Sequence, residues 1–343
     1  MHPTSTSLRS RAVAVTGALA LFVVATLLFA GMTGSIHIPL PDIAGALHEL
    51  FAPIDGATPS LAATLLELRG TRALTAFVTG AALSLSGVMM QALLRNPLAD
   101  PYVLGISAGS AVGALFAMML MCATWMVDAA AFAGAVTIAM LLYFLARRDM
   151  RSGAAAEGGT ALLLLTGVIL SAACTALITL MLSIAPESRL RNMVFWLIGD
   201  LSGAPFRLMP WIVLAVCVIF ALRSARAINV MALHAESAVT LGINVGLLRK
   251  GLFFASALLT ASAVTNGGSV GFVGLIVPHA CRFAFGADHR VLIPAATLLG
   301  GGYLVLADTL ARTAIAPQQL PVGVVTALIG TPVFLYQLHR LRK

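Results

Sequence analysis

The chain has 343 residues, of which 59% are hydrophobic and only 10% are charged. Soluble domains carry about 25% charged residues, so this composition excludes a water-soluble globule and indicates a membrane protein. The formal net charge is +8, but the basic residues lie in short connections between apolar runs, where they orient membrane proteins. We therefore expect membrane lipid and no nucleic acid among the partners.

Ten apolar stretches are long enough for transmembrane helices, which need about 20 residues to cross a bilayer. The first follows two arginines and is longer than the apolar core of a signal peptide, so we interpret it as a retained span. The sequence thus predicts an all-α polytopic membrane protein that forms a single transmembrane domain over residues 1–343. The predicted spans are 12–33, 73–94, 102–122, 127–146, 160–184, 208–224, 250–266, 268–286, 290–308 and 321–338.

An even number of spans places both termini on the same side of the membrane. Fifteen lysines and arginines fall on the side of the termini, and six fall on the other side. Because basic residues accumulate on the cytoplasmic side, we predict that both termini are cytoplasmic and that the protein lies in a bacterial inner membrane.

Two connections are longer than turns. On the outer side, residues 34–71 contain PDIAGALHELFA at 41–52, whose apolar residues share one helical face. This pattern predicts a short helix on the membrane surface. On the inner side, residues 225–249 form a mildly polar stretch that we also expect to be helical.

The chain lacks the phosphate-binding loop of nucleotide-binding proteins and the zinc motif of metalloproteases. Neither GxxxxGK[ST] nor HExxH occurs, so we expect no enzymatic activity and no cofactor in this chain. The four cysteines are scattered, without a CxxC, and are interpreted as small buried apolar residues. A membrane-embedded enzyme is therefore the weakest functional hypothesis.

Acidic residues and broken helices at mid-membrane depth are typical of carriers driven by ion gradients. Neither is apparent here, so such a carrier is an alternative rather than the leading hypothesis. Asp308 and Arg312 are four residues apart near the outer end of a span, which predicts a local ion pair. Small residues recur at four-residue spacing within 80–87 and 105–113, which favours either close helix packing or a smooth pathway wall.

Several motifs together resemble the FecCD family, the permease subunits of ATP-binding-cassette (ABC) importers for iron chelates and cobalamin. The resemblance implies the type II ABC importer permease fold and a homodimer with a pathway on its two-fold axis. It also implies two cytoplasmic ATPase subunits, which carry ATP and magnesium, and one periplasmic binding protein. The motifs are LRGTR (68–72), GAALSLSGVMMQALLRNPLADPYVLGISAGS (80–110), ALHAESAVTLGIN (232–244), GFVGLIVPHACR with GADHR (271–290), LADTLAR (306–312) and LPVGVVTALIGTPVFL (320–335).

The first group of site residues implied by the resemblance is Arg69, Arg72 and Arg312. They match family positions that face the periplasm and pair with acidic side chains of the binding protein, and the charge count also places them outside. Attraction between opposite charges would orient docking. The alternatives are contacts with lipid headgroups or, for Arg312, the ion pair with Asp308.

The second group is Glu236, Ala238 and Gly242, which match the cytoplasmic segment that couples the permease to its ATPase. Small residues allow close seating, and glycine permits a turn between two helices. The alternative is an ordinary surface helix. His234 stands where the family commonly has glycine, which leaves the local geometry open.

The third group is the gates. The resemblance implies a gate at Ser107 and Ala108, and a second one at Gly159 and Thr160 in the loop before the fifth span.

Two further residues leave alternatives open. His279 could be a haem ligand or a proton shuttle, but a packed, hydrogen-bonded histidine is favoured by its position. Gln319 stands where the family usually carries an acid. From the distribution of the family, we expect the substrate to be haem or a ferric siderophore, with cobalamin as the alternative.

Overall fold

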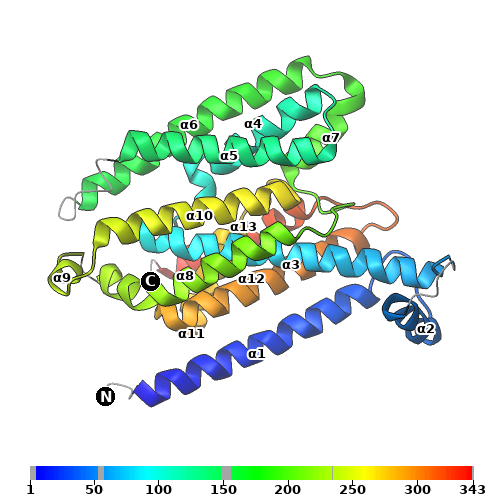
Figure 1. The fold of residues 1–343 in the computed structure, drawn as a ribbon, viewed down its shortest axis with the longest axis horizontal. Coiled ribbons are helices and arrows are strands. Elements are labelled where there is room, and N and C mark those ends of the chain that lie inside the picture. The colour runs from blue at the N-terminus through cyan, green and yellow to red at the C-terminus, as the bar shows by residue number, and fades with distance from the viewer. Residues whose placement is uncertain (1–4, 53–57, 148–155, 234, 342–343) are drawn as a thin grey trace.

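A computed structural model of the chain describes residues 5–52, 58–147, 156–233 and 235–341. These residues form helices and no strands (Figure 1). The helices are α1 (Ser5–Met32), α2 (Leu40–Phe51), α3 (Leu61–Leu94), η1 (Pro101–Leu104), α4 (Ile106–Met119), α5 (Thr124–Ala146), α6 (Ala156–Ile184), α7 (Glu187–Ile198), α8 (Leu208–Leu233), α9 (Ala235–Thr240), α10 (Val245–Gly267), α11 (Val273–Phe285), α12 (His289–Thr313) and α13 (Val322–Leu341).

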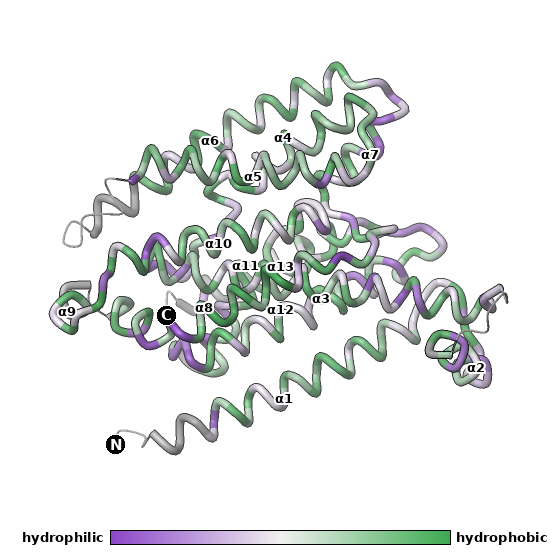
Figure 2. The backbone as a smooth tube through the Cα atoms, in the orientation of Figure 1, coloured by the Kyte–Doolittle hydropathy of each residue, from purple (hydrophilic) through white to green (hydrophobic). Residues whose placement is uncertain are grey.

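The predicted all-α polytopic fold is confirmed. Seven helices are long and apolar enough to cross a membrane, namely α1, α3, α5, α6, α8, α10 and α12. The other three predicted spans coincide with the shorter apolar helices α4, α11 and α13. Figure 2 shows hydrophobic residues along the middle of the helices and hydrophilic residues at their ends.

Helix α3 occupies the centre of the bundle. Its residues are buried almost continuously from Ala73 to Leu94, and it packs against α8, α10, α11 and α12. Helices α4, α5 and α6 form a second layer above α10 (Figure 1). Ring contacts between Tyr143 of α5 and Phe253 and Phe254 of α10 join the two layers.

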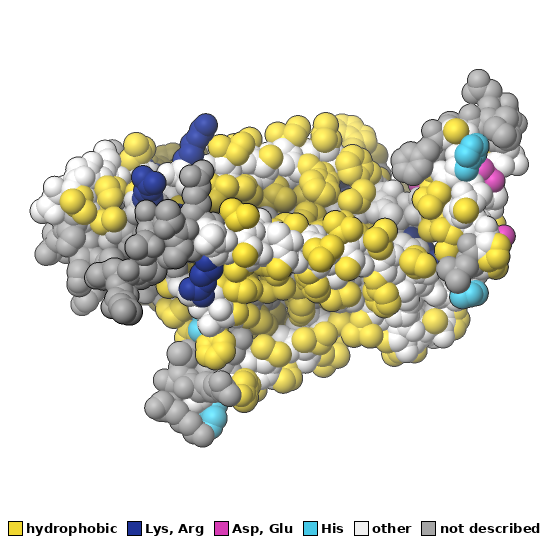
Figure 3. Space-filling view, turned by 90° about the horizontal axis from the view of Figure 1, so that it is seen from below, with side chains coloured by type: hydrophobic (Ala, Val, Ile, Leu, Met, Phe, Trp, Pro, Cys, Tyr) yellow, Lys and Arg dark blue, Asp and Glu magenta, His cyan; other side chains and the backbone are white. Residues whose placement is uncertain are grey.

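The molecule has two distinct ends. Helix α2 lies at one end, and α9 lies at the other end together with both chain termini (Figure 1). We call these the α2 end and the α9 end. A common side for the two termini agrees with an even number of crossings. On the face drawn in Figure 3, lysines and arginines gather toward the α9 end of an apolar band.

Small residues allow α3 to approach its neighbours at backbone distance. Gly80 lies against the carbonyl of Gly300 on α12, and Gly87 lies against the carbonyl of Gly274 on α11. Buried hydroxyls add a polar contact with α10, where the Ser86 Oγ is 2.7 Å from the Oγ of Ser256. Because apolar burial drives helices together only weakly in lipid, close packing and hydroxyl bonds take that role. The geometry supports the close-packing interpretation of residues 80–87.

Both long connections are shorter than predicted. Helix α3 begins at Leu61, so Arg69 and Arg72 lie on a helix and not in a loop over 34–71. With 34 residues, α3 is about 51 Å long and exceeds the thickness of about 30 Å of the bilayer core. At the other end, α8 continues to Leu233, so only α9 and short flanking segments remain of the inner loop.

Two further features differ from the prediction. Helix α7, a short helix that follows Pro186, was not predicted from the sequence. The continuous span predicted at 102–122 is wrong, because Gly105 separates η1 from α4 with a φ of +79°. A side chain at Gly105 would also lie 3.2 Å from the backbone nitrogen of Ser171 on α6. Glycine is therefore needed both for the turn and for the close approach.

Candidate functional site

The α2 end contains a cavity of about 700 Å³. Four segments that are distant in the sequence surround it, because the connection after α1, the start of α3, the connection between α7 and α8, and the chain from the end of α12 to Gln319 meet there. All three arginines predicted for docking lie in its wall. The lining residues are Gly34, Ser35, Ile36, Leu65, Glu67, Leu68, Arg69, Thr71, Arg72, Ser202, Gly203, Ala204, Pro205, Phe206, Arg312 and Gln319.

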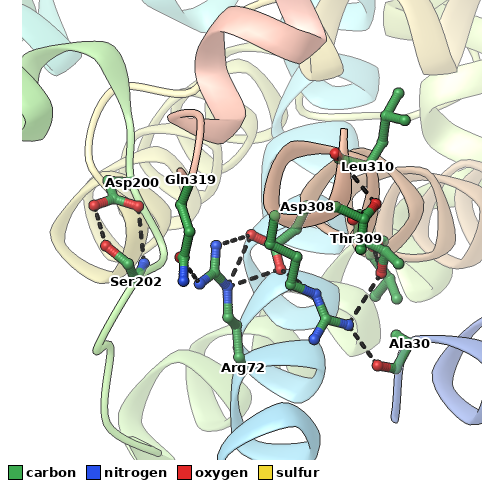
Figure 4. Close-up of polar contacts among 11 residues, drawn as sticks. Ala30, Arg72, Asp200, Ser202, Asp308, Thr309, Leu310 and Gln319 are labelled. Atoms are coloured by element: carbon green, nitrogen blue, oxygen red, sulfur yellow. Dashed lines mark hydrogen bonds and ion pairs between the residues drawn. The ribbon is translucent and has the colours of Figure 1, made fainter. Parts of the chain in front are cut away.

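Arg72 of α3 binds the carboxylate of Asp308 on α12 in a bidentate manner (Figure 4). The Nε donates to Oδ2 at 2.9 Å, and the Nη2 donates to Oδ1 at 2.8 Å. The Nη1 donates to the Oε1 of Gln319 at 2.7 Å. Asp308 is almost fully buried, with 2% of its surface exposed. This contact therefore ties α3, α12 and the segment before α13 together at the mouth of the cavity.

The predicted ion pair between Asp308 and Arg312 is present, with 3.9 Å between the Oδ2 and the Nε. Arg72 is nevertheless the closer partner of Asp308. The Nη2 of Arg312 donates instead to the carbonyl of Ala30 at the end of α1. A single carboxylate thus faces two guanidinium groups, and the second of these also holds α1.

Arg69 is also engaged within the chain. Its guanidinium donates to the carbonyl of Met32, the last residue of α1, and to that of Ile36 in the connection to α2. Arg69 and Arg312 are each only 6% exposed, so neither extends freely into solvent. Among the three predicted docking residues, Arg72 is the most accessible, with 12% of its side chain exposed.

Helix α2 is fixed beside this cavity by Glu49, whose carboxylate accepts a hydrogen bond of 2.9 Å from the backbone nitrogen of Ser60. This bond lowers the pKa of Glu49 below its ordinary value. The expected amphipathic helix at 41–52 is present as α2. Because Ser60 caps α3, Glu49 links α2 directly to the helix that carries Arg69 and Arg72.

At the α9 end, the segment predicted to couple to an ATPase forms α9 and the turn that follows it. Ala238 is fully buried, whereas Gly242 is exposed and has a φ of +79°. The turn is closed by a bond of 2.9 Å from the nitrogen of Ile243 to the carbonyl of Ala238. Glu236 lies on α9, but its side chain is outside the described part of the structure, and so is His234.

The same segment exposes two large apolar side chains that were not among the predicted coupling residues. Val239 is 55% exposed and Leu241 is 69% exposed. Two neighbouring exposed apolar side chains on a short projecting turn form a surface suited to contact with a partner protein. Both are large apolar residues within a mildly polar segment, which is the sequence signal that could have identified them.

The predicted gate residues lie in different surroundings. The Oγ of Ser107, at the start of α4, is 3.0 Å from the Oγ of Ser269 in the connection between α10 and α11. Ala108 is partly exposed. Gly159 and Thr160 lie near the start of α6, and their surroundings are outside the described part. The α6 residues beside the break at Gly105 are Gly167 and Ser171 instead.

His279 is half-buried, and its Nδ1 is enclosed without a hydrogen-bond partner in the described part of the chain. The expected hydrogen bond is therefore missing at this nitrogen. Within the described ranges, no three His, Cys, Asp or Glu side chains are grouped closely enough to hold a metal ion. The four cysteines are free thiols.

A polar cluster also orders the α9 end. Asp288 caps α12 and accepts a bond of 2.6 Å from Arg290 and one of 2.7 Å from Asn229 on α8. The bond from Arg290, with the help of Asn229, lowers the pKa of Asp288 to about 2. Asp288 therefore stays charged at physiological pH and connects α8 to α12.

Comparison with known protein families identifies the family to which this sequence belongs. The model of the FecCD transport family matches residues 19–340, which is nearly the whole chain. The chain belongs to the FecCD transport family. It is therefore a permease of a binding-protein-dependent ABC importer.

The names of the relatives of this FecCD permease specify different substrates. The vitamin B12 import system permease protein BtuC of Escherichia coli O9:H4 (strain HS) is 37% identical over 301 residues, 86% of this chain and 90% of that protein. The hemin transport system permease protein HmuU of Yersinia pestis is 39% identical over 287 residues, 81% of this chain and 84% of that protein.

A solved structure, described as an inward-facing conformation of a metal-chelate type ABC transporter, has a TM-score of 0.81 with this FecCD permease. It is 28% identical and covers 96% of this chain and 99% of that chain. The folds therefore correspond over nearly their full length, including both ends described above.

Proposed function

We propose that the chain is the membrane-spanning subunit of an ATP-driven importer that carries an iron chelate, haem or a ferric siderophore, across the bacterial inner membrane. It works as a homodimer with two cytoplasmic ATPase subunits, which hold ATP and magnesium, and one periplasmic binding protein. The α9 end and both termini are cytoplasmic. The observation that carries the proposal is the family match over residues 19–340 together with the exposed apolar turn at the α9 end.

The α2 end is the docking side for the binding protein in this proposal. Three arginines and two acids, Glu67 and Asp308, surround the cavity or its wall, so the local balance is positive. Arg72 is the residue that reaches an acidic side chain of the partner. Arg69 and Arg312 hold the end of α1 and keep the wall in place. Complementary charge would orient the encounter rather than supply most of the affinity.

The coupling surface is the turn that contains Val239, Leu241 and Gly242. Buried Ala238 fixes this turn on the permease side, while the two exposed apolar side chains enter a groove of the ATPase. Glu236 contributes on the same helix. ATP binding and hydrolysis then move α8 and α10, which flank α9, and alternate the gates near Ser107 and at the start of α6.

A charge inserted into the coupling surface tests this function. In liposomes that contain the chain, its ATPase and a loaded binding protein, we expect Leu241→Asp to reduce ATP-dependent uptake at least about tenfold, because a central apolar anchor would be replaced by a desolvated charge. Leu241 is exposed, so the fold tolerates the change.

Leu61→Asp serves as the matched control, because Leu61 is 70% exposed at the opposite end. Co-purification of the ATPase should be lost for Leu241→Asp and kept for Leu61→Asp. Unchanged uptake and unchanged ATPase binding in Leu241→Asp would rule out this coupling surface. Uptake that persists without any ATPase subunit would favour the alternative of a carrier driven by an ion gradient.

Cobalamin is the second candidate substrate, because BtuC, a vitamin B12 permease, covers 86% of this chain. Uptake assays with haem, a ferric siderophore and cobalamin, each with the binding protein that retains it, distinguish the candidates. Transport of cobalamin alone would contradict the iron-chelate proposal and leave the permease function intact.

A further inference from the structure

Arg249 on α10 is a buried cation that lacks a counter-charge in the described part of the chain. Only 7% of its surface is exposed. No hydrogen bond or ion pair joins it to another described residue. Among the described residues, the charged group that acts on it is Arg95, which has the same sign.

A buried guanidinium without an acceptor loses its hydration and gains nothing in return. Arg249 is located near the α9 end, four residues into α10, so an acceptor can approach from outside the protein. None of its nitrogens is among the fully enclosed, unpaired side-chain atoms of the described residues. A ligand can therefore still reach the guanidinium.

The register of the helices places further basic side chains at the depth of Arg249 along the bundle. Helices α5 and α10 pack against each other and run in opposite directions, with Tyr143 against Phe253. One turn closer to the α9 end, α5 carries Arg147 and α10 carries Arg249, which is followed by Lys250.

Helix α3 completes the cluster. It ends at the same level with Arg95 as its C-cap. The ends of three helices thus carry four basic residues at one level, Arg95, Arg147, Arg249 and Lys250, which we call the basic cluster, and Arg95 is the one near enough to act on Arg249.

The surroundings of this basic cluster are apolar and exposed. Phe144 is 54% exposed and Leu145 is 62% exposed on α5, and Leu247 is 67% exposed on α10. Such side chains face lipid chains in a membrane protein, while the basic residues reach the level of the headgroups. Basic pockets between helices at the cytoplasmic surface bind the headgroups of anionic lipids.

We propose that Arg249, together with Arg95, Arg147 and Lys250, binds the phosphate of an anionic phospholipid headgroup at the α9 end. The headgroup supplies an acceptor that no described residue gives to the buried guanidinium, and the acyl chains lie against the exposed apolar residues of α5 and α10. A free phosphate offers the same headgroup chemistry but leaves this apolar surface uncovered. The bound lipid would sit beside α9, close to the turn proposed to contact the ATPase.

The test compares lipids on the purified full chain in detergent. Native mass spectrometry and the thermal unfolding temperature are measured with added phosphatidylglycerol, phosphatidylcholine or inorganic phosphate. We expect retained phosphatidylglycerol and a raised unfolding temperature with that lipid alone. Arg249→Gln should weaken the apparent affinity for phosphatidylglycerol about fivefold or more, because each basic side chain near an anionic membrane surface contributes about that factor.

Two variants separate lipid binding from a general loss of charge. Arg249→Lys should keep most of the retained lipid, whereas Arg223→Gln, which removes an exposed arginine of α8, should keep all of it. An equal response to phosphatidylcholine, or the full response with inorganic phosphate alone, would overturn the proposal. So would displacement of the lipid from the wild-type chain when the ATPase subunits bind, since the partner would then supply the anion.

Discussion

Asp308→Asn is expected to lower the free energy of unfolding of the purified chain by about 3–5 kcal/mol, the usual cost of removing one partner of a buried ion pair. The carboxylate of Asp308 is 2% exposed and is bound by Arg72 and approached by Arg312. Without its charge, two guanidinium groups face each other at the cavity wall. Unfolding by denaturant in detergent micelles measures the loss.

A double-mutant cycle assigns this loss to the pair. Arg72→Gln and Asp308→Asn together should cost less than the sum of the two single changes, because the second change removes a charge that is already unpaired. Asp42→Asn on α2 is the control, since Asp42 is exposed and has no ion pair in the described part of the chain. Additive effects, or an unfolding free energy of Asp308→Asn equal to that of the wild type, would contradict this assignment.

The docking arginines illustrate what the sequence could and could not show. Composition and charge bias placed Arg69, Arg72 and Arg312 near one membrane face, and the structure brings all three to one cavity. The sequence also revealed the pair of Asp308 and Arg312, because four residues on a helix are neighbours. The stronger pair joins residues 236 positions apart, and no local pattern reports such a distance.

The helix boundaries were also predictable only where they depend on local sequence. Apolar length located a helix in each predicted span, since hydropathy responds directly to the bilayer. It did not reveal the break at Gly105, because a glycine within an apolar run is also common in unbroken membrane helices. The left-handed backbone there depends on the approach of α6, which is a tertiary contact.

In the coupling segment, the matched motifs pointed to Ala238, whereas the apolar side chains exposed to a partner are those of Val239 and Leu241.

Gly87→Val is expected to remove most of the folded protein. A Cβ atom at Gly87 would lie 2.6 Å from the carbonyl carbon and 2.9 Å from the Cα of Gly274 on α11. Both neighbours are backbone atoms, so no side-chain rotation relieves the overlap and the two helices must separate. Overpacking in a core typically costs about 1–3 kcal/mol, and backbone overlap places this variant at the upper end or beyond. The yield of monodisperse protein and its thermal unfolding temperature measure the effect.

Gly70→Val on the same helix provides the matched control, because a Cβ atom at Gly70 meets nothing within 4 Å. Its unfolding temperature should equal or slightly exceed that of the wild type, since glycine is a poor helix former. The contrast isolates contact between α3 and α11 from helix propensity, which is the same for both changes. Equal stability of the two variants would mean that α3 does not need backbone contact with α11. The close-packing interpretation of the glycine motif at 80–87 would then be wrong.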